Sequence, residues 1–229
     1  MITIKYKKHR VIKRPTKKIK KKNIISMSLY GTGARYSKGA IWNMQNYKKY
    51  YPGWTLRIYC EYRHPLIKEL RDGGCEVIIQ KIDKERGPAY PMFWRFFAIE
   101  DPLARYIIVR DIDSKLNEKG AAAVKDWIKS GLDFHIMEDY YWPTKWHKMS
   151  GSGFGIKGGV ITDIKNIIAR WTKNKYIKYY DDEYFLSTKI WPLIKKSCLT
   201  HSSFRKPGSK KFPITKSKIT KAVGAREFR

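Results

Sequence analysis

The sequence has few cysteines, few acids and no long apolar run, and each shortage argues against a class of protein. Its 229 residues contain three cysteines, Cys60, Cys75 and Cys198, and this odd number fits neither a disulfide framework nor a zinc site. No stretch approaches the roughly 20 apolar residues of a transmembrane helix. The basic N-terminus also lacks the apolar core of a secretory signal. We therefore expect a protein of a reducing, intracellular setting whose thiols are structural.

Acidic residues are scarce beside basic ones, and the imbalance is greatest at the two ends. The chain has 20 Asp and Glu against 49 Lys and Arg, a net charge of +29. Residues 1–22 hold eleven Lys and Arg without an acid, and residues 205–229 hold nine with one acid. We predict a basic N-terminal arm (1–22), a globular domain (23–204) and a basic C-terminal tail (205–229), the arms being partly disordered. Such arms suit polyanions or an anionic membrane surface, although a charge that only aids solubility is an alternative interpretation.

Strand-like and helix-like segments alternate along the globular part. With 42% apolar residues the domain can bury a sizeable core. The alternation predicts an α/β fold, a single domain with a mostly parallel central sheet flanked by helices. The expected strands are 23–29, 55–60, 76–80, 106–109 and 134–137, and the expected helices are 38–50, 65–70, 92–99, 117–129, 161–174 and one from 181 onward.

The most informative motif is an Asp-X-Asp placed directly after an expected buried strand. Asp111 and Asp113 follow the run from Tyr106 to Val109, and alternation along extended backbone puts both on one side. Ligands of open α/β sheets bind at the carboxyl ends of the strands. Two carboxylates there suit a hard cation such as Mg²⁺ or Mn²⁺, which also binds diphosphate oxygens. A turn or a helix cap is the alternative interpretation.

Three further features are each open to functional and structural interpretations. Asp139 follows an expected strand and is either a base, a ligand of sugar hydroxyls or an ordinary loop acid. Trp142 and Trp146 either stack on a sugar ring or pack in the core. The glycine-rich stretch 151–159 either brings backbone close to a sugar or phosphate or forms a structural turn.

Taken together, these segments resemble the GT-A-type nucleotide-diphospho-sugar glycosyltransferases, in particular their small viral, phage and bacterial members. The resemblance covers most of residues 23–204, and its order and spacing are more specific than any one motif. The matching segments are Ser28 to Gly31 with Tyr36, Gly39-Ala40, Tyr51 to Trp54, Trp94 to Phe96, Arg110 to Ser114, Ala123-Val124 with Trp127, Phe134 to Asp139, 151–155, Asp182 to Leu186 and His201.

The resemblance implies a role for each matching residue. It implies metal ligands at Asp111, Asp113 and His201, nucleotide contacts at Ser28, Tyr30, Gly31 and Tyr36, phosphate or sugar contacts at Arg95 and Arg110, and catalytic carboxylates at Asp139, Asp182 and Glu183. Three positions depart from the family pattern. Glu138-Asp139 replaces Arg-Asp, Tyr140 and Tyr141 stand where a His-rich segment is usual, and Glu183 replaces a Gln whose amide can donate hydrogen bonds.

We therefore predict a metal-dependent, hexosyltransferase-like enzyme that moves a sugar from a nucleoside-diphosphate sugar to an acceptor hydroxyl. The expected cofactor is Mn²⁺ or Mg²⁺. The sequence does not decide between inversion and retention; if the transfer inverts, Asp139 is the first candidate base and Asp182 the second, whereas a retaining transfer has no such clear need for a base. The acceptor is unknown, and a polyanionic glycan or nucleic acid would suit the charge. The expected location is the cytoplasm of a bacterial or virus-infected cell. The alternatives are a non-catalytic nucleic-acid- or polyanion-binding protein and a metal-dependent nuclease or phosphatase.

Overall fold

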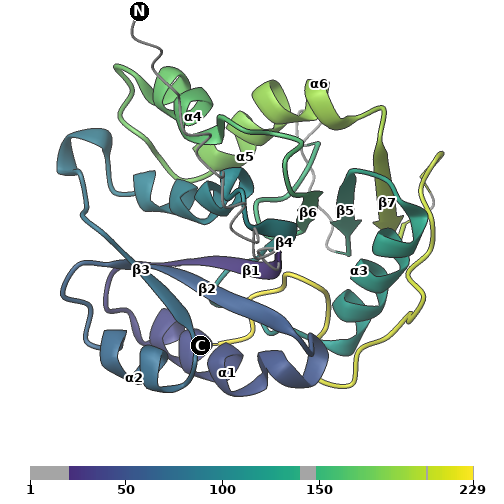
Figure 1. The fold of residues 1–229 in the computed structure, drawn as a ribbon, viewed down its shortest axis with the longest axis horizontal. Helices are drawn as coiled ribbons and strands as arrows, with labels where there is room; N and C mark the ends of the chain where they lie inside the picture. The colour runs from purple at the N-terminus through teal and green to yellow at the C-terminus, as the bar shows by residue number, and fades with distance from the viewer. Residues whose placement is uncertain (1–20, 140–147, 205, 229) are drawn as a thin grey trace, which may run out of the picture.

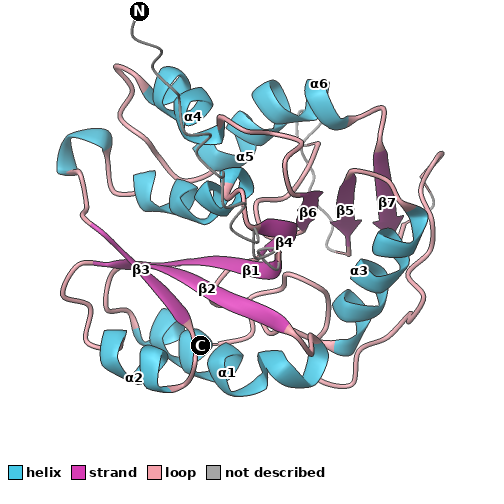
Figure 2. Cartoon of the chain, in the orientation of Figure 1, coloured by secondary structure: helices cyan, strands magenta, loops and turns pink. Residues whose placement is uncertain are grey.

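A seven-stranded sheet forms the centre of the computed structural model, which describes residues 21–139, 148–204 and 206–228 (Figures 1 and 2). The strand order is β3-β2-β1-β4-β6-β5-β7, and β6 alone runs antiparallel to its neighbours. The expected α/β fold with a mostly parallel sheet is confirmed. The strands are β1 (Lys22–Leu29), β2 (Trp54–Glu61), β3 (Glu76–Gln80), β4 (Ala104–Val109), β5 (Phe134–Glu138), β6 (Phe154–Lys157) and β7 (Cys198–Ser202).

Helices cover both faces of the sheet (Figure 2). One face carries α1 (Ala34–Tyr50), α2 (Ile67–Asp72) and α3 (Glu118–Ser130). The other carries the 3₁₀ segment Tyr90–Glu100, α4 (Ile164–Thr172) and the helical run of α5 (Asp181–Phe185), the π-turn Leu186–Ile190 and α6 (Trp191–Ile194); a short 3₁₀ turn, Lys84–Arg86, precedes them. None of the described helices combines the length and apolarity needed to cross a bilayer.

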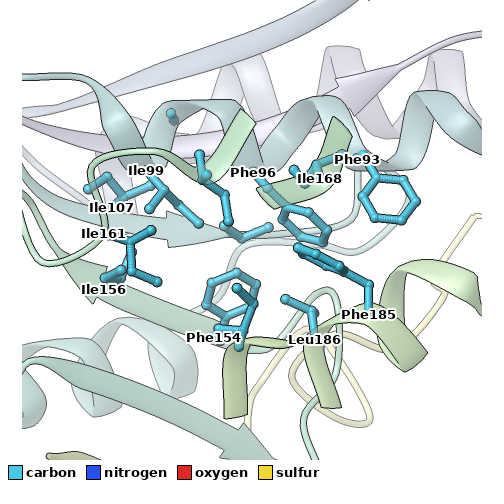
Figure 3. Close-up of a cluster of buried hydrophobic side chains, with 14 of the residues drawn as sticks. Phe93, Phe96, Ile99, Ile107, Phe154, Ile156, Ile161, Ile168, Phe185 and Leu186 are labelled. Atoms are coloured by element: carbon cyan, nitrogen blue, oxygen red, sulfur yellow. The ribbon is translucent and has the colours of Figure 1, made fainter. Parts of the chain in front are cut away.

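Alternation along the strands divides the core between the two faces. Ile107 of β4 belongs to the cluster under the 3₁₀ segment and α4, whereas its neighbour Ile108 belongs to the cluster under α1 and α3. Figure 3 shows the first cluster, where rings from the 3₁₀ segment meet Phe185 of α5. Phe93 and Phe96 lie 5.4 Å and 6.4 Å from Phe185 between ring centroids. This packing fixes the backbone on either side of Arg95 and just after Asp182 and Glu183.

The ends of α3 follow from local sequence, as expected. The Asn117 side chain accepts a hydrogen bond of 2.8 Å from the Gly120 N–H, which satisfies a donor of the first turn. Gly131 ends the helix in the left-handed region, at φ +73°. The start of α1 differs from our expectation of residue 38, because the helix begins one turn earlier, at Ala34.

The glycine-rich stretch contains a strand that we did not expect. β6 lies between β4 and β5, where Gly155 faces the Trp127 side chain of α3. A Cβ on Gly155 would lie only 2.9 Å from an atom of the Trp127 ring. This glycine therefore serves close packing between strand and helix. β7 was also missed, because its sequence, Cys198–Ser202, carries no apolar alternation.

The described part of the C-terminal tail is packed on the domain, which corrects our expectation of a partly disordered arm. It is the yellow segment of Figure 1, running beside α3 and ending near α1. Phe212 is buried with Ala123, Met137 and Val223. Farther along, Phe228 lies 6.5 Å from Trp42 of α1 between ring centroids. The N-terminal arm, by contrast, falls almost wholly in residues 1–20, outside the described part.

The cysteines are structural rather than reactive. Cys60 and Cys75 are buried and Cys198 is partly buried, all three as free thiols. Burial raises the pKa of Cys60 and Cys75 to about 12. Because the thiolate is the nucleophile and the metal ligand, these two side chains are inert at neutral pH.

Candidate functional site

A cavity of about 630 Å³ opens at the carboxyl edge of β1, β4 and β5. Parallel strands bring the residues that follow them to one edge, which is where α/β folds bind ligands. Segments distant in sequence meet there: the ends of β1 and β4, the start of α1, the 3₁₀ segment, residues 148–153, the start of α5 and the C-terminal tail. The charged residues among its lining are Arg35, Arg95, Asp111, Asp113, Glu138, Asp139, Lys148, Asp182, Glu183, Lys221, Arg226 and Glu227.

Both carboxylates of the Asp-X-Asp motif line this cavity, and each pairs with an arginine. Arg95 Nη1 donates to Asp111 Oδ1 at 2.6 Å, and Arg35 Nε lies 3.0 Å from Asp113 Oδ2. Burial raises the pKa of Asp113, and the nearby charge of Asp111 raises it further. Two adjacent carboxylates in a partly buried site are an environment that a divalent cation would stabilise.

Arg95 connects this pair to a second group of carboxylates. Its Nη2 donates to Asp182 Oδ2 at 2.6 Å, while its backbone N–H donates to Ser28 Oγ at 2.9 Å. The guanidinium is buried, so these charge-assisted bonds are well shielded from water. Gly151 makes room for the pair, since a Cβ there would lie 2.4 Å from Arg95 Nη2. Gly151 thus makes room for the side chains of Arg95 and Asp182.

Glu183 is a carboxylate whose pKa lies near neutral pH. Burial raises its pKa to about 7, with a further contribution from the neighbouring Asp182 charge. Its Oε1 accepts a hydrogen bond of 3.3 Å from the Gly151 N–H. Burial also raises the pKa of Asp182, against the opposing effect of Arg95. Glu183 therefore has the acidity of a group that exchanges protons at physiological pH.

Three of the four residues expected to contact the nucleotide lie on another wall of the cavity: Ser28, Tyr30 and Tyr36. The rings of Tyr30 and Tyr36 are 6.4 Å apart at an interplanar angle of 22°. Gly31 does not line the cavity. It turns the chain after β1 at φ +66°, and its N–H donates to Glu61 Oε2 at 2.7 Å.

Asp139 lines the cavity, but its carboxylate already binds three groups. Lys119 Nζ lies 2.5 Å from Oδ1, the Ser203 hydroxyl donates to the same oxygen, and the Val223 N–H donates to Oδ2 at 2.7 Å. Asp139 thus joins α3, the end of β7 and the tail. The aromatic loop expected beside it, with Tyr140, Tyr141, Trp142 and Trp146, lies outside the described residues.

Two expected site residues are not brought to the cavity. Arg110 points into the sheet, where Nη1 donates to the carbonyls of Val109 and Phe154 at 2.6 Å and 3.1 Å. Its place follows from alternation, since its neighbour Asp111 faces the opposite way. His201 is buried on β7, the strand beside β5, with Nδ1 2.8 Å from His135 Nε2 and Nε2 3.1 Å from Asp126 Oδ2. The structure therefore gives His201 no part beside Asp111 and Asp113.

Asp111 and Asp113 are the two carboxylates of the cavity that we expected to hold a cation, and their oxygens are hard ligands. Within the described residues no cluster of three or more His, Cys, Asp or Glu side chains is arranged to hold a metal. Two carboxylates fit Mg²⁺ or Mn²⁺ when water and diphosphate oxygens complete the shell. The residue types suit this cation, and the ligand would supply the rest of the coordination.

Sequence reasoning missed several residues of the cavity wall. Arg35 follows β1, the neighbour of β4, so its place near Asp113 could have been inferred from the meeting of adjacent strand ends. The tail residues Lys221 to Glu227 gave no such signal, because only contacts across about 100 residues bring them to the site.

The fold is GT-A-like, and a solved glycosyltransferase structure shares it. It is similar to the crystal structure of a glycosyltransferase involved in the glycosylation of the major capsid of PBCV-1, with a TM-score of 0.52, 11% identity, and 79% of this chain and 81% of that one covered. It is also similar to S. aureus TarS 1–349 in complex with UDP-GlcNAc, with a TM-score of 0.51, 10% identity, and 83% and 57% covered. No protein-family model matches the chain, and no curated protein is similar in sequence.

Proposed function

We propose that this protein is a glycosyltransferase that moves a sugar from a nucleoside-diphosphate sugar to an acceptor hydroxyl, with a divalent cation at Asp111 and Asp113. One observation carries the proposal. A single cavity brings this carboxylate pair together with an aromatic wall at Tyr30 and Tyr36 and with the acid Glu183. Such a cavity offers separate places for a nucleoside, a diphosphate and a reacting hydroxyl. The GT-A fold supports the same reaction class.

In this proposal the donor binds to the cavity wall that carries Ser28, Tyr30 and Tyr36, beside the two aspartates. Ser28, Tyr30 and Tyr36 contact the nucleoside, and the aromatic rings offer apolar faces to it. Asp111 and Asp113 hold Mn²⁺ or Mg²⁺, which when bound acts as a Lewis acid on the leaving diphosphate. Arg95 keeps Asp111 oriented through its bond of 2.6 Å. The UDP-GlcNAc bound to S. aureus TarS is an example of such a donor.

Glu183 is the proposed proton acceptor for an inverting transfer. The acceptor oxygen attacks the anomeric carbon, the bond from that carbon to the diphosphate breaks, and the hydroxyl proton passes to the Glu183 carboxylate. Asp139 and Asp182 are less suited to this role, because Lys119 and Arg95 respectively hold them in ion pairs of 2.5 Å and 2.6 Å. The pKa of Glu183, about 7, matches the task of a base at neutral pH.

Release of nucleoside diphosphate from nucleotide sugars tests the proposal. The full chain is incubated with UDP-, GDP-, CDP- and dTDP-sugars and MnCl₂, with and without simple sugar acceptors, and the nucleotides are separated chromatographically. We expect turnover of one donor class, its loss with EDTA, and its loss in Asp113→Asn. Asp72→Asn is the matched control, because this carboxylate is 61% exposed in an ion pair with Lys68.

The two alternative functions give different results in the same experiment. A nuclease or phosphatase would cleave a phosphodiester or phosphomonoester without any sugar donor. A non-catalytic polyanion-binding protein would turn over no donor and would bind nucleic acid with a strong dependence on salt. Either result in place of donor turnover would overturn the proposal.

A further inference from the structure

The C-terminal tail forms one wall of the cavity. Six of its residues line the cavity: Lys221, Val223, Gly224, Ala225, Arg226 and Glu227. The tail crosses directly behind the Asp-X-Asp motif, where the Glu227 N–H donates to the Asp113 carbonyl at 3.2 Å. Ser114 and Arg226 also pair as an antiparallel bridge. Lys221 and Arg226 therefore lie on a segment that contacts the backbone of the expected cation ligand Asp113.

Several contacts hold this segment in one conformation. The Lys221 N–H donates to Glu227 Oε1 at 3.2 Å, which closes residues 221–227 into a loop. Gly224 adopts φ +81°, and a Cβ there would lie 2.9 Å from Ser152 Oγ. Phe228 anchors the end, with Lys115 Nζ 5.2 Å from its ring centroid. The backbone that carries the two cations is thus fixed by other residues.

Lys221 and Arg226 differ from Arg35 and Arg95, the other two arginines that line the cavity, in their carboxylate partners. Arg35 and Arg95 are held by Asp113 and Asp111. In the described part of the chain, neither Lys221 nor Arg226 forms a salt bridge with a carboxylate. The Arg226 guanidinium lies 5.5 Å from the ring centroid of Tyr179, which also lines the cavity. The charge of Arg226 acts on the Asp113 carboxylate without forming a salt bridge with it. Two cations outside salt bridges at a cavity are an anion-binding feature.

We propose that Lys221 and Arg226 bind the diphosphate of the donor, so that the C-terminal tail is part of the donor site. This inference rests on the proposed function. A diphosphate bound beside Asp113 lies next to the chain that carries Arg226. The guanidinium offers paired N–H donors that match phosphate oxygens, and Lys221 adds a second charge from the same loop.

Isothermal titration of the full chain with nucleotides tests the inference. UDP, GDP, CDP and ADP are titrated in MnCl₂, and the tightest is compared with its own nucleoside. For Arg226→Ala and Lys221→Ala we expect diphosphate affinity to fall about tenfold each, since a charge-assisted bond is removed, while nucleoside affinity is unchanged. Lys216→Ala, an exposed lysine of the same tail outside the cavity, is the matched control and should bind like wild type.

The outcomes separate this inference from the proposed function. If the wild type binds no nucleoside diphosphate, the proposed function fails. If the wild type binds and both alanine variants bind equally well, only the tail assignment is overturned. If nucleoside affinity falls as much as diphosphate affinity, the two residues support the cavity as a whole and the diphosphate assignment is wrong. Partial recovery in Arg226→Lys would support a charge contact with phosphate.

Discussion

Two parts of the cavity meet at Asp113, a floor and a tail wall, and they are built in different ways. The floor, which we define as Arg95, Asp111 and Asp182, stands on buried strands and on the aromatic packing of Phe93, Phe96 and Phe185. The tail wall, residues 221–228, is held by single hydrogen bonds to Asp139 and Asp113 and by the anchors Phe212 and Phe228. The comparison indicates that the floor forms whenever the domain folds, whereas the tail wall can be lost without loss of the fold.

The same substitution in the two regions gives the sharpest contrast. Phe96→Ala removes a fully buried ring of the core and should lower the free energy of unfolding by about 4 kcal/mol. Phe212→Ala should cost clearly less, because the tail can detach from the domain, and it should weaken nucleoside-diphosphate binding. Urea denaturation and nucleotide titration measure both effects. Equal losses of stability would show that tail and domain unfold as one unit.

The largest catalytic effect is expected for Asp113→Asn, at the point where the floor and the tail wall meet. The amide keeps the shape of the carboxylate but removes a charged cation ligand, so donor turnover should fall roughly 100- to 1,000-fold. The melting temperature should stay close to that of the wild type, because the amide is uncharged and the native carboxylate has a raised pKa. Wild-type turnover in this variant would remove Asp113 from the mechanism.

Glu183→Gln should lower the transfer rate about 100-fold, because the amide cannot accept the acceptor proton. The pH profile gives the sharper test. Since a base acts in its deprotonated form and the pKa of Glu183 is about 7, wild-type kcat/KM should be constant above pH 7 and fall toward tenfold per unit below it. This acidic limb should be absent in Glu183→Gln. An unchanged limb would assign it to another group.

The smallest effect concerns the histidines between the sheet and the tail. Burial, together with the charges of His201 and Arg110, keeps the pKa of His135 well below its ordinary value of about 6.5. The unfolded chain therefore binds a proton at this position that the folded chain does not. As a result, the contribution of neutral His135 to the free energy of unfolding is fully present above pH 6.5 and is lost as the pH falls below it. His135→Gln should reduce this slope in denaturation between pH 7 and 5. A slope equal to the wild type would exclude His135 as its source.

Local signals explain which parts of this fold the sequence predicts. The β4 run leads to Asp111 and Asp113 at a strand end, and Asn117 and Gly131 mark the ends of α3; each prediction needed only neighbouring residues. The alternation that aims Asp111 at the cavity also turns Arg110 away from it. The assignment of Arg110 by resemblance alone overlooked this period of two.

Other parts depend on contacts that no local pattern contains. β6 lies in a glycine-rich stretch in which Gly155 fits against Trp127, and the tail reaches the site only through contacts such as the hydrogen bond of the Val223 N–H to Asp139. The tail resembled a disordered arm in its charge composition, because a lysine-rich sequence occurs both in disordered arms and in tails that pack on a domain. His201 was placed by resemblance, and its burial against His135 and Asp126 depends on the pairing of β5 with β7.

Stabilisation by nucleotide sugars tests the central claim most directly: that carboxylates at the rim of the sheet hold a cation that binds a diphosphate. The melting temperature of the wild type and of Asp113→Asn is measured with a panel of nucleotide sugars, with and without Mn²⁺. We expect one nucleotide class to raise the wild-type melting temperature only when Mn²⁺ is present, and to leave the melting temperature of Asp113→Asn unchanged. A ligand at 100 times its Kd adds about 2.7 kcal/mol to the free energy of unfolding, which is large enough to detect. No shift with any nucleotide sugar, or the same shift in both proteins, would contradict the account.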